Sequence, residues 1–296
     1  MHIFNRHTKR LLVFMFFAVL ALPLFSSSDA LARDEAATRL HLVSVGSGDP
    51  DNITLKAVTV IRDADIVFCD KRIRDKFPVL LHGKEIHDIG FGIFGIFGKS
   101  MEEAKKNKRF NYEEKTKELK QIDAVIRAAV RNGKKVAVLD SGDPTIYGPH
   151  MWYMEAFEDL NPEVVPGISC FNAANAALKK GVTSGKNTHS VILTASFGRE
   201  DAGGTDSIEN LSANRASMVF FTMFLNMDEV VKKLRVHYLP ETPIAIVLNA
   251  GYREKERVIR GTLGTILAEM KGEKLPFEHL IYVGDFLTNR YQASGK

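Results

Sequence analysis

The stretch "LHLVSVGSGDPDNITLKAVTVIRDADIVFCD" (residues 40–70) decides the fold. It begins with an apolar, β-branched run at 40–46 and passes through a glycine turn. It then continues with helical spacing of apolar residues over 53–64 and closes on a second apolar run at 65–70. Strands with continuous apolar runs, separated by a helix, are typical of a parallel α/β sheet that is buried on both faces.

The same alternation continues along the chain. Further strands are expected at 85–90, 134–140 and 163–167, with helices at 113–133, 150–160 and 168–181, the last ending at Gly181. Residues 181–190, "GVTSGKNTHS", are polar and predict a boundary between an N-terminal α/β domain (39–182) and a C-terminal α/β domain (188–290). In the second domain we expect strands at 190–196, 217–223, 242–250, 254–263 and 279–286, and helices at 226–236 and 263–271. Some of its connections are short enough for hairpins, so its sheet is expected to be mixed.

The first 32 residues do not resemble the rest. Arg6, Lys9 and Arg10 precede an apolar run over residues 11–25, and small residues then end in Ala-Leu-Ala at 30–32. This order is typical of an export signal that is cleaved after an A-x-A pattern. Fifteen apolar residues are short for crossing a bilayer, which takes about 20. An uncleaved membrane anchor is the next interpretation. We expect an exported, periplasmic protein or one anchored facing outside, and a cytoplasmic one if the segment is not a working signal.

Composition excludes some classes of function. The chain is 45% hydrophobic and 26% charged, as in ordinary globular proteins, and its formal charge of +4 is too small to indicate a dedicated nucleic-acid binder. Its two cysteines, Cys69 and Cys170, could pair in an exported protein or could both be small buried side chains. No C-x-x-C or His/Cys cluster indicates a metal site.

The tetrapeptide SGDP occurs at 47–50 and again at 141–144, each time at the end of an expected strand. The carboxyl ends of strands are where open α/β sheets bind ligands, and glycine lets the backbone approach a ligand closely. Asp49-Pro50 and Asp143-Pro144 also suit the first positions of a helix, so simple capping is the alternative to a shared site. The flanking sequences do not repeat, so the copies are not a domain duplication.

Several motifs together carry a resemblance to a known family. The first strand and helix read "LVSVGSGDPDNITLKA", and "SGDPTIYG" (141–148) and "VVPGISC" (164–170) follow. The C-terminal half adds "LNAGYREKERVIRGTL" and "LIYVGDF". In order and spacing, from about residue 40 to 287, the chain resembles the tetrapyrrole (corrin/porphyrin) methylases. Ser44, Ser47 and Ser141 depart from the family's usual residues.

The resemblance implies a two-domain enzyme that binds S-adenosylmethionine in the cleft between its domains and methylates a carbon of a tetrapyrrole. It also implies a homodimer. Carried over by position, the cofactor contacts are Ser47, Ser141, Gly142, Asp143, Ile146, Ser169, Cys170, Thr222 or Met223, Ala250 and Gly251. No catalytic residue follows from the motifs. Tyr147 and Asp70 are candidates for a base, with structural roles as the alternative.

Basic side chains near the cleft should hold the carboxylates of a tetrapyrrole. The candidates are Lys71, Arg72, Arg74 and Arg253, each of which could equally belong to a solvated face. The Phe-, Ile- and Gly-rich segment 90–114 is open to three interpretations, namely a flap over an apolar ligand, a membrane-touching loop, or a plain insertion. The alternative to an enzyme is an exported, non-catalytic module that binds a tetrapyrrole or haem.

Overall fold

The computed structural model describes residues 38–106, 109–195, 205–221 and 225–289. By its internal contacts the chain divides into two compact units, Met1–Ala37 and Thr38–Lys296, and all described residues belong to the second. The expected signal or anchor and two of the expected cofactor contacts, Thr222 and Met223, therefore lie outside the described residues. None of the helices that are described has the length and apolar character needed to span a membrane.

The N-terminal sheet has five parallel strands in the order β3-β2-β4-β1-β5. These strands are β1 (Leu40–Ser44), β2 (Ile66–Phe68), β3 (Glu85–His87), β4 (Val136–Asp140) and β5 (Glu163–Val165). The helical segments between them are η1 (Pro50–Asn52), α2 (Leu55–Asp63), α3 (Lys71–Lys76), η2 (Ile93–Gly95), α4 (Met101–Lys106), α5 (Tyr112–Arg131), α6 (Pro144–Tyr147), α7 (Trp152–Ala156) and η3 (Glu158–Leu160). Because all pairs are parallel, the carboxyl ends of the strands share one edge.

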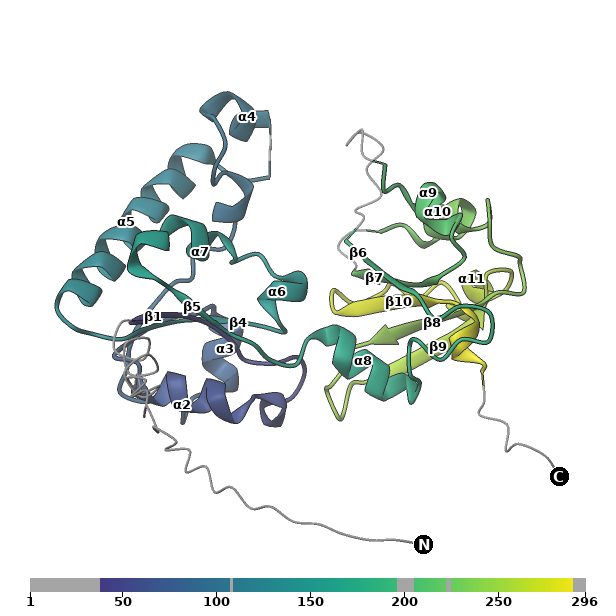
Figure 1. The fold of residues 1–296 in the computed structure, drawn as a ribbon, viewed down its shortest axis with the longest axis horizontal. Coiled ribbons are helices and arrows are strands. Elements are labelled where there is room, and N and C mark those ends of the chain that lie inside the picture. Colours follow the sequence, from purple (N-terminus) through teal and green to yellow (C-terminus); the bar gives the residue numbers. More distant parts are fainter. Residues whose placement is uncertain (1–37, 107–108, 196–204, 222–224, 290–296) are drawn as a thin grey trace, which may run out of the picture. The chain divides into compact units, whose positions relative to one another are not determined.

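Alternate side chains of these strands enter two apolar clusters, one on each face. Leu42 and Val138 pack with Ile126 of α5 and Trp152 of α7 on one face. On the other face Val43, Val67 and Leu139 pack with Ala57 and Ile61 of α2 and Ile73 of α3. Figure 1 shows the two groups of helices on opposite sides of the sheet. Burial of each large apolar side chain stabilises the fold by about 1.5–3 kcal/mol, which fixes the sheet that carries the site.

The C-terminal sheet is mixed, in the order β6-β7-β10-β8-β9. β6 pairs in parallel with β7, and the other pairs are antiparallel. Its strands are β6 (Val191–Thr194), β7 (Ser217–Phe221), β8 (Pro243–Leu248), β9 (Arg257–Thr262) and β10 (His279–Val283), with α9 (Ile208–Ser212), α10 (Met227–Leu234), α11 (Ile266–Glu269) and η4 (Asp285–Leu287). One parallel and one mixed sheet confirm the expected fold class.

Helix α8 (Cys170–Leu178) packs against the C-terminal sheet. It follows β5 in the chain, yet Ala173, Ala174 and Leu178 lie in a cluster with Val219 and Tyr282 of the C-terminal sheet. The strands of each sheet come from one side of the expected boundary at 181–190, and the boundary itself stays a prediction.

Three local expectations differ from the structure. α8 ends with Lys179 in the left-handed region (φ 55°), two residues before the expected stop at Gly181. Asp49-Pro50 opens only the short 3-10 turn η1, and Thr54 caps α2 by accepting a hydrogen bond from the Ala57 N–H. The expected helix over 150–160 is divided into α7 and η3.

Candidate active site

The two SGDP stretches lie side by side because β1 and β4 are neighbours in the sheet. Beyond the strands, Gly46 and Gly142 form an isolated bridge in which the Gly142 N–H donates to the Gly46 carbonyl at 3.1 Å. The Ser44 hydroxyl also donates to the Gly142 carbonyl. Gly46 and Gly142 have φ of 78° and 72°, values that a side chain disfavours. The two turns therefore form one continuous backbone surface.

A turn from the C-terminal half closes against the first SGDP stretch. The Asp49 N–H donates to the Gly251 carbonyl at 2.9 Å, and the Ser47 hydroxyl contacts the Ala250 carbonyl at 3.4 Å. The Asn52 amide donates to the Ser47 carbonyl at 2.8 Å. The Asp49 carboxylate accepts from the Arg253 N–H at 2.9 Å instead of capping its own helix. Three segments far apart in sequence thus meet at the carboxyl edge of β1.

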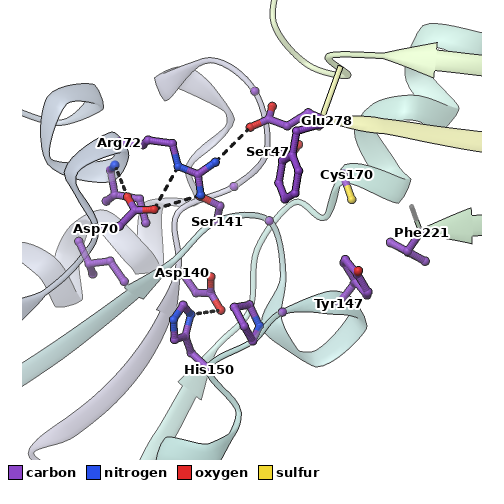
Figure 2. Close-up of a pocket in the computed structure, with 18 of the residues that line it drawn as sticks. Ser47, Asp70, Arg72, Asp140, Ser141, Tyr147, His150, Cys170, Phe221 and Glu278 are labelled. Atoms are coloured by element: carbon purple, nitrogen blue, oxygen red, sulfur yellow. Dashed lines mark hydrogen bonds and ion pairs between the residues drawn. The ribbon is translucent and has the colours of Figure 1, made fainter. Parts of the chain in front are cut away.

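These segments surround a cavity of about 400 Å³, shown in Figure 2. The volume lies within the range of about 300–1,000 Å³ that is typical of ligand pockets. The residues that line it are Gly46, Ser47, Gly48, Asp70, Arg72, Ile73, Lys76, Ile89, Phe91, Phe94, Leu139, Asp140, Ser141, Gly142, Tyr147, Gly148, Pro149, His150, Cys170, Phe221, Ala250, Tyr252, Phe277, Glu278, His279 and Leu280. The lining combines glycine turns, aromatic rings and carboxylates.

Five of the expected cofactor contacts line this cavity: Ser47, Ser141, Gly142, Cys170 and Ala250. Phe221 lines it too. The next two residues in the chain, Thr222 and Met223, are the expected contacts that lie outside the described residues. Burial raises the pKa of the Cys170 thiol to about 11, so the thiol is neutral and unsuited to act as a nucleophile near neutral pH.

The other four expected contacts lie near the cavity without lining it. The Asp143 carboxylate caps α6 by accepting from the Thr145 N–H at 2.9 Å and its hydroxyl at 2.6 Å. The Ser169 hydroxyl caps α8 in the same way. Ile146 is 45% exposed, and Gly251 contacts the first loop through its backbone. The expectation that these four touch a cofactor stays a prediction.

The two candidate bases both line the cavity. Tyr147 stacks on Phe221 with ring centroids 4.9 Å apart, its hydroxyl is buried without a hydrogen bond, and burial raises its pKa. Asp70 caps α3 by accepting from the Ile73 N–H at 2.8 Å and pairs with Arg72 at 3.1 Å. Asp70 is therefore already engaged by its own helix.

Of the four candidate basic residues, only Arg72 lines the cavity. Its guanidinium lies 3.9 Å from Glu278 in addition to its pair with Asp70 (Figure 2). Lys71 pairs with Asp75, and Arg253 pairs with Asp51 at 2.7 Å. Arg74 is exposed and is not part of the lining.

The polar residues of the lining that were not expected from the sequence include Lys76, Asp140, His150 and Glu278. The Lys76 ammonium donates to the Gly48 carbonyl at 2.6 Å, and burial lowers its pKa. Asp140 ends a strand whose other residues are all apolar, and that contrast was a signal in the sequence. His150 carries no such signal, because it stands in a stretch read as an ordinary helix.

The segment 90–114 contributes an apolar wall. Ile93 is buried in the N-terminal core and Ile96 is buried too, while Phe91 and Phe94 line the cavity. Phe94 also contacts the ring of Phe110 edge-on, with centroids 5.4 Å apart. Of the three interpretations, a cover over an apolar ligand agrees with this packing.

Residues of both SGDP turns line one cavity together with Cys170, which follows the P-G-I-S turn, and Ala250 of the Asn-Ala-Gly turn. The sequence model of the tetrapyrrole (corrin/porphyrin) methylases matches residues 39–267. This chain belongs to the tetrapyrrole methylases.

Individual methylases support the assignment. The chain is 31% identical over 261 residues to the cobalt-precorrin-4 C(11)-methyltransferase of Methanocaldococcus jannaschii, covering 87% of this chain and 92% of the relative. It is 26% identical to the uroporphyrinogen-III C-methyltransferase of Cyanidium caldarium, covering 87% and 96%.

Solved methylase structures share the fold. A cobalt-precorrin-4 methyltransferase has a TM-score of 0.65 and 23% identity, covering 84% of this chain and 95% of that one. The uroporphyrin-III C-methyl transferase of Thermus thermophilus, complexed with S-adenyl homocysteine, has a TM-score of 0.55 and 22% identity, covering 84% and 99%.

Proposed function

We propose that this methylase transfers a methyl group from S-adenosylmethionine to a carbon of a tetrapyrrole. The observation that carries the proposal is the convergence of the family's motifs on one cavity, whose lining includes Ser47, Ser141, Gly142, Cys170 and Ala250. The named relatives over most of the chain's length are C-methyltransferases. The non-catalytic alternative, an exported tetrapyrrole- or haem-binding module, has no support in these comparisons.

The chemistry of the lining fits this cofactor. A sulfonium and an amino group are positive, and the lining offers the carboxylates of Asp70 and Glu278. The backbone approaches the cavity closely at Gly46 and Gly142, and the stacked rings of Tyr147 and Phe221 offer an aromatic surface to an adenine. Among the described residues no cluster of His, Cys, Asp and Glu is arranged to hold a metal ion.

When bound, the cofactor supplies a methyl group that is activated for in-line displacement. The contribution of the protein is to hold the acceptor carbon in line and to exclude water from the reacting groups. Phe91, Phe94 and Ile89 form an apolar wall suited to the face of a macrocycle. Arg72, at the exposed side of the cavity, suits a peripheral carboxylate of the substrate.

Among tetrapyrroles, a precorrin-4-like substrate is the first candidate. Relatives named for methylation of precorrin-4 or cobalt-precorrin-4 match this chain at 31% identity in Methanocaldococcus jannaschii and 27% in Pseudomonas aeruginosa. The uroporphyrinogen-III methyltransferase of Cyanidium caldarium matches at 26%.

Two experiments test the proposal. Calorimetry of the purified protein with S-adenosylmethionine should give saturable binding. No binding at high micromolar ligand would refute the proposal that the protein is an S-adenosylmethionine-dependent enzyme. Incubation of a panel of tetrapyrroles with a labelled donor, followed by mass spectrometry, should show addition of one labelled methyl group to the true substrate. Binding without any methylation across the panel would contradict the substrate class.

The remaining proposals concern location and assembly. The basic and apolar pattern of residues 1–32 supports export or membrane anchoring. N-terminal sequencing of the protein from its native cells should begin at residue 33 if the signal is cleaved after Ala32. The homodimer is supported by the habit of the family, and sedimentation equilibrium should give twice the chain mass.

A further inference from the structure

An acid–histidine pair lies in the cavity wall, with one residue directly before the second SGDP turn and the other after helix α6. Asp140 is the last residue of β4, and His150 follows α6. Asp140 Oδ2 lies 3.0 Å from His150 Nδ1, and both side chains are 6% exposed. Figure 2 shows one carboxylate oxygen on the His150 ring and the other turned away from it.

The pair is buried without being satisfied. Asp140 Oδ2 and both ring nitrogens of His150 are buried and have no well-aligned hydrogen bond. Leaving a buried polar group unpaired costs about 1–3 kcal/mol, so such groups call for an explanation beyond stability. The glycine at position 148 keeps side-chain atoms away from this carboxylate, because a Cβ there would stand 2.9 Å from Asp140 Oδ2.

Asp140 is the lining carboxylate that has no basic Lys or Arg partner within the described part of the chain. Asp70 is held by the Ile73 N–H and by Arg72, and Glu278 lies 3.9 Å from the same Arg72 guanidinium. Tyr147 and Cys170 are weak bases at the start of a reaction, because burial raises the pKa of each and keeps both protonated. Asp140 is thus the carboxylate of the lining best placed to receive a proton.

Methylation of a pyrrole-type carbon creates a need for such a group. The electron pair of a ring C=C bond forms the new C–C bond, the methyl–sulfur bond breaks with its pair going to sulfur, and positive charge spreads to the ring nitrogen. Loss of the N–H proton, with its electron pair staying on nitrogen, restores neutrality. A carboxylate that accepts this proton lowers the energy of the charged state in a site where water is scarce.

Resting on the proposed function, we propose that the Asp140 carboxylate accepts the N–H proton of the tetrapyrrole during methyl transfer, with His150 as the positioning residue that fixes its orientation. The broken N–H bond is replaced by an O–H bond on Asp140, so no further reactant is required. His150 Nδ1 faces Asp140 Oδ2, and the other carboxylate oxygen, which turns away from the ring, is left for the substrate.

Steady-state kinetics of Asp140→Asn and His150→Gln test the assignment. We expect kcat of Asp140→Asn to fall by about 100- to 10,000-fold, the contribution usual for a general base. The KM for the tetrapyrrole and the calorimetric Kd for S-adenosylmethionine should stay within threefold. His150→Gln should lower kcat by about tenfold with the same KM. Formate should restore activity at least tenfold in Asp140→Ala and leave the native enzyme unchanged.

The sheet offers a matched control pair. His41 and Glu163 lie 3.8 Å apart on β1 and β5, and neither lines the cavity. His41→Gln and Glu163→Gln should keep kcat within twofold. If the native enzyme methylates a tetrapyrrole but Asp140→Asn keeps more than a third of kcat, this inference alone is wrong. Loss of kcat in Asp140→Ala without rescue by formate would assign Asp140 a structural role and overturn it. If the native enzyme methylates no tetrapyrrole, the proposed function fails and this inference with it.

Discussion

Replacement of Gly48 by alanine should disrupt the contact between the two halves of the site. Gly48 has φ of 84°, and a Cβ there would stand 2.2 Å from the Gly251 carbonyl carbon and 2.5 Å from its Cα. Both contacts are with backbone, so the two segments must separate. The Gly251 carbonyl would then lose its hydrogen bonds from the Asp49 N–H at 2.9 Å and the Asn52 amide at 3.3 Å.

The expected loss of stability is the sum of the backbone strain and the lost hydrogen bonds. A left-handed alanine costs roughly 1–2 kcal/mol, and each lost hydrogen bond costs about 1 kcal/mol. The free energy of unfolding should therefore fall by about 3–4 kcal/mol. Gly83→Ala is the control, because Gly83 has φ of 75° and a Cβ there would meet nothing within 4 Å. It should show the backbone cost alone.

Urea unfolding measures both variants. Trp152 is the single tryptophan and is buried in the N-terminal core, so its fluorescence reports on the first sheet, while circular dichroism reports on both. A loss in Gly48→Ala that lies within about 0.5 kcal/mol of the loss in Gly83→Ala would refute the reasoning. It would mean that the first loop and the Gly251 turn separate at no cost.

Two further predictions concern Asp143 and His279. Asp143→Ala removes the cap of α6, which accepts from the Thr145 N–H, and should lower the free energy of unfolding by about 0.5–2 kcal/mol. It should also weaken S-adenosylmethionine binding. Asp143→Asn keeps an acceptor for the cap. If the carboxylate itself binds the cofactor, calorimetry should show weaker binding in both variants, and unchanged affinity in both would remove Asp143 from the site. Burial lowers the pKa of His279 below its ordinary value near 6.5, so protonation favours the unfolded chain and stability falls as the pH drops through this value. His279→Asn keeps a donor toward the Pro276 carbonyl, and its Tm should fall less than that of the native protein between pH 7.5 and 5.5; an equal fall would contradict this.

The layout of the sheets could be predicted from the sequence because their strands are buried on both faces. Runs such as residues 134–140 have no polar alternation, and each lies between segments with helical spacing. Helix α3 was not expected, since only Ile73 of its six residues is buried and its apolar spacing is too sparse to read. Its start depends on the Asp70 cap, a single hydrogen bond that many turns could offer equally.

The site could be predicted where backbone geometry constrains the residue type. Gly142 and its neighbours appear in the sequence as glycine turns, because a left-handed φ at a strand end favours glycine. Asp140 and His150 could not be paired in advance, since they lie ten positions apart in the chain with helix α6 between them. Asp143 shows the converse, because a motif residue that the family resemblance assigns to the cofactor also serves as a helix cap here.

The bridge between Gly46 and Gly142 determines which side of the cavity can change shape to admit a large ligand. Hydrogen bonds from Val45 to Asp140 and from Gly142 to Gly46 join the two turns into one rigid wall. Such a wall is preorganised and loses little conformational entropy when a ligand settles on it. Phe91 and Phe277 are 44% and 58% exposed, so solvent rather than protein meets much of each ring. We therefore expect a macrocycle to be admitted by rotation of these rings, while the glycine wall keeps the same shape for every substrate.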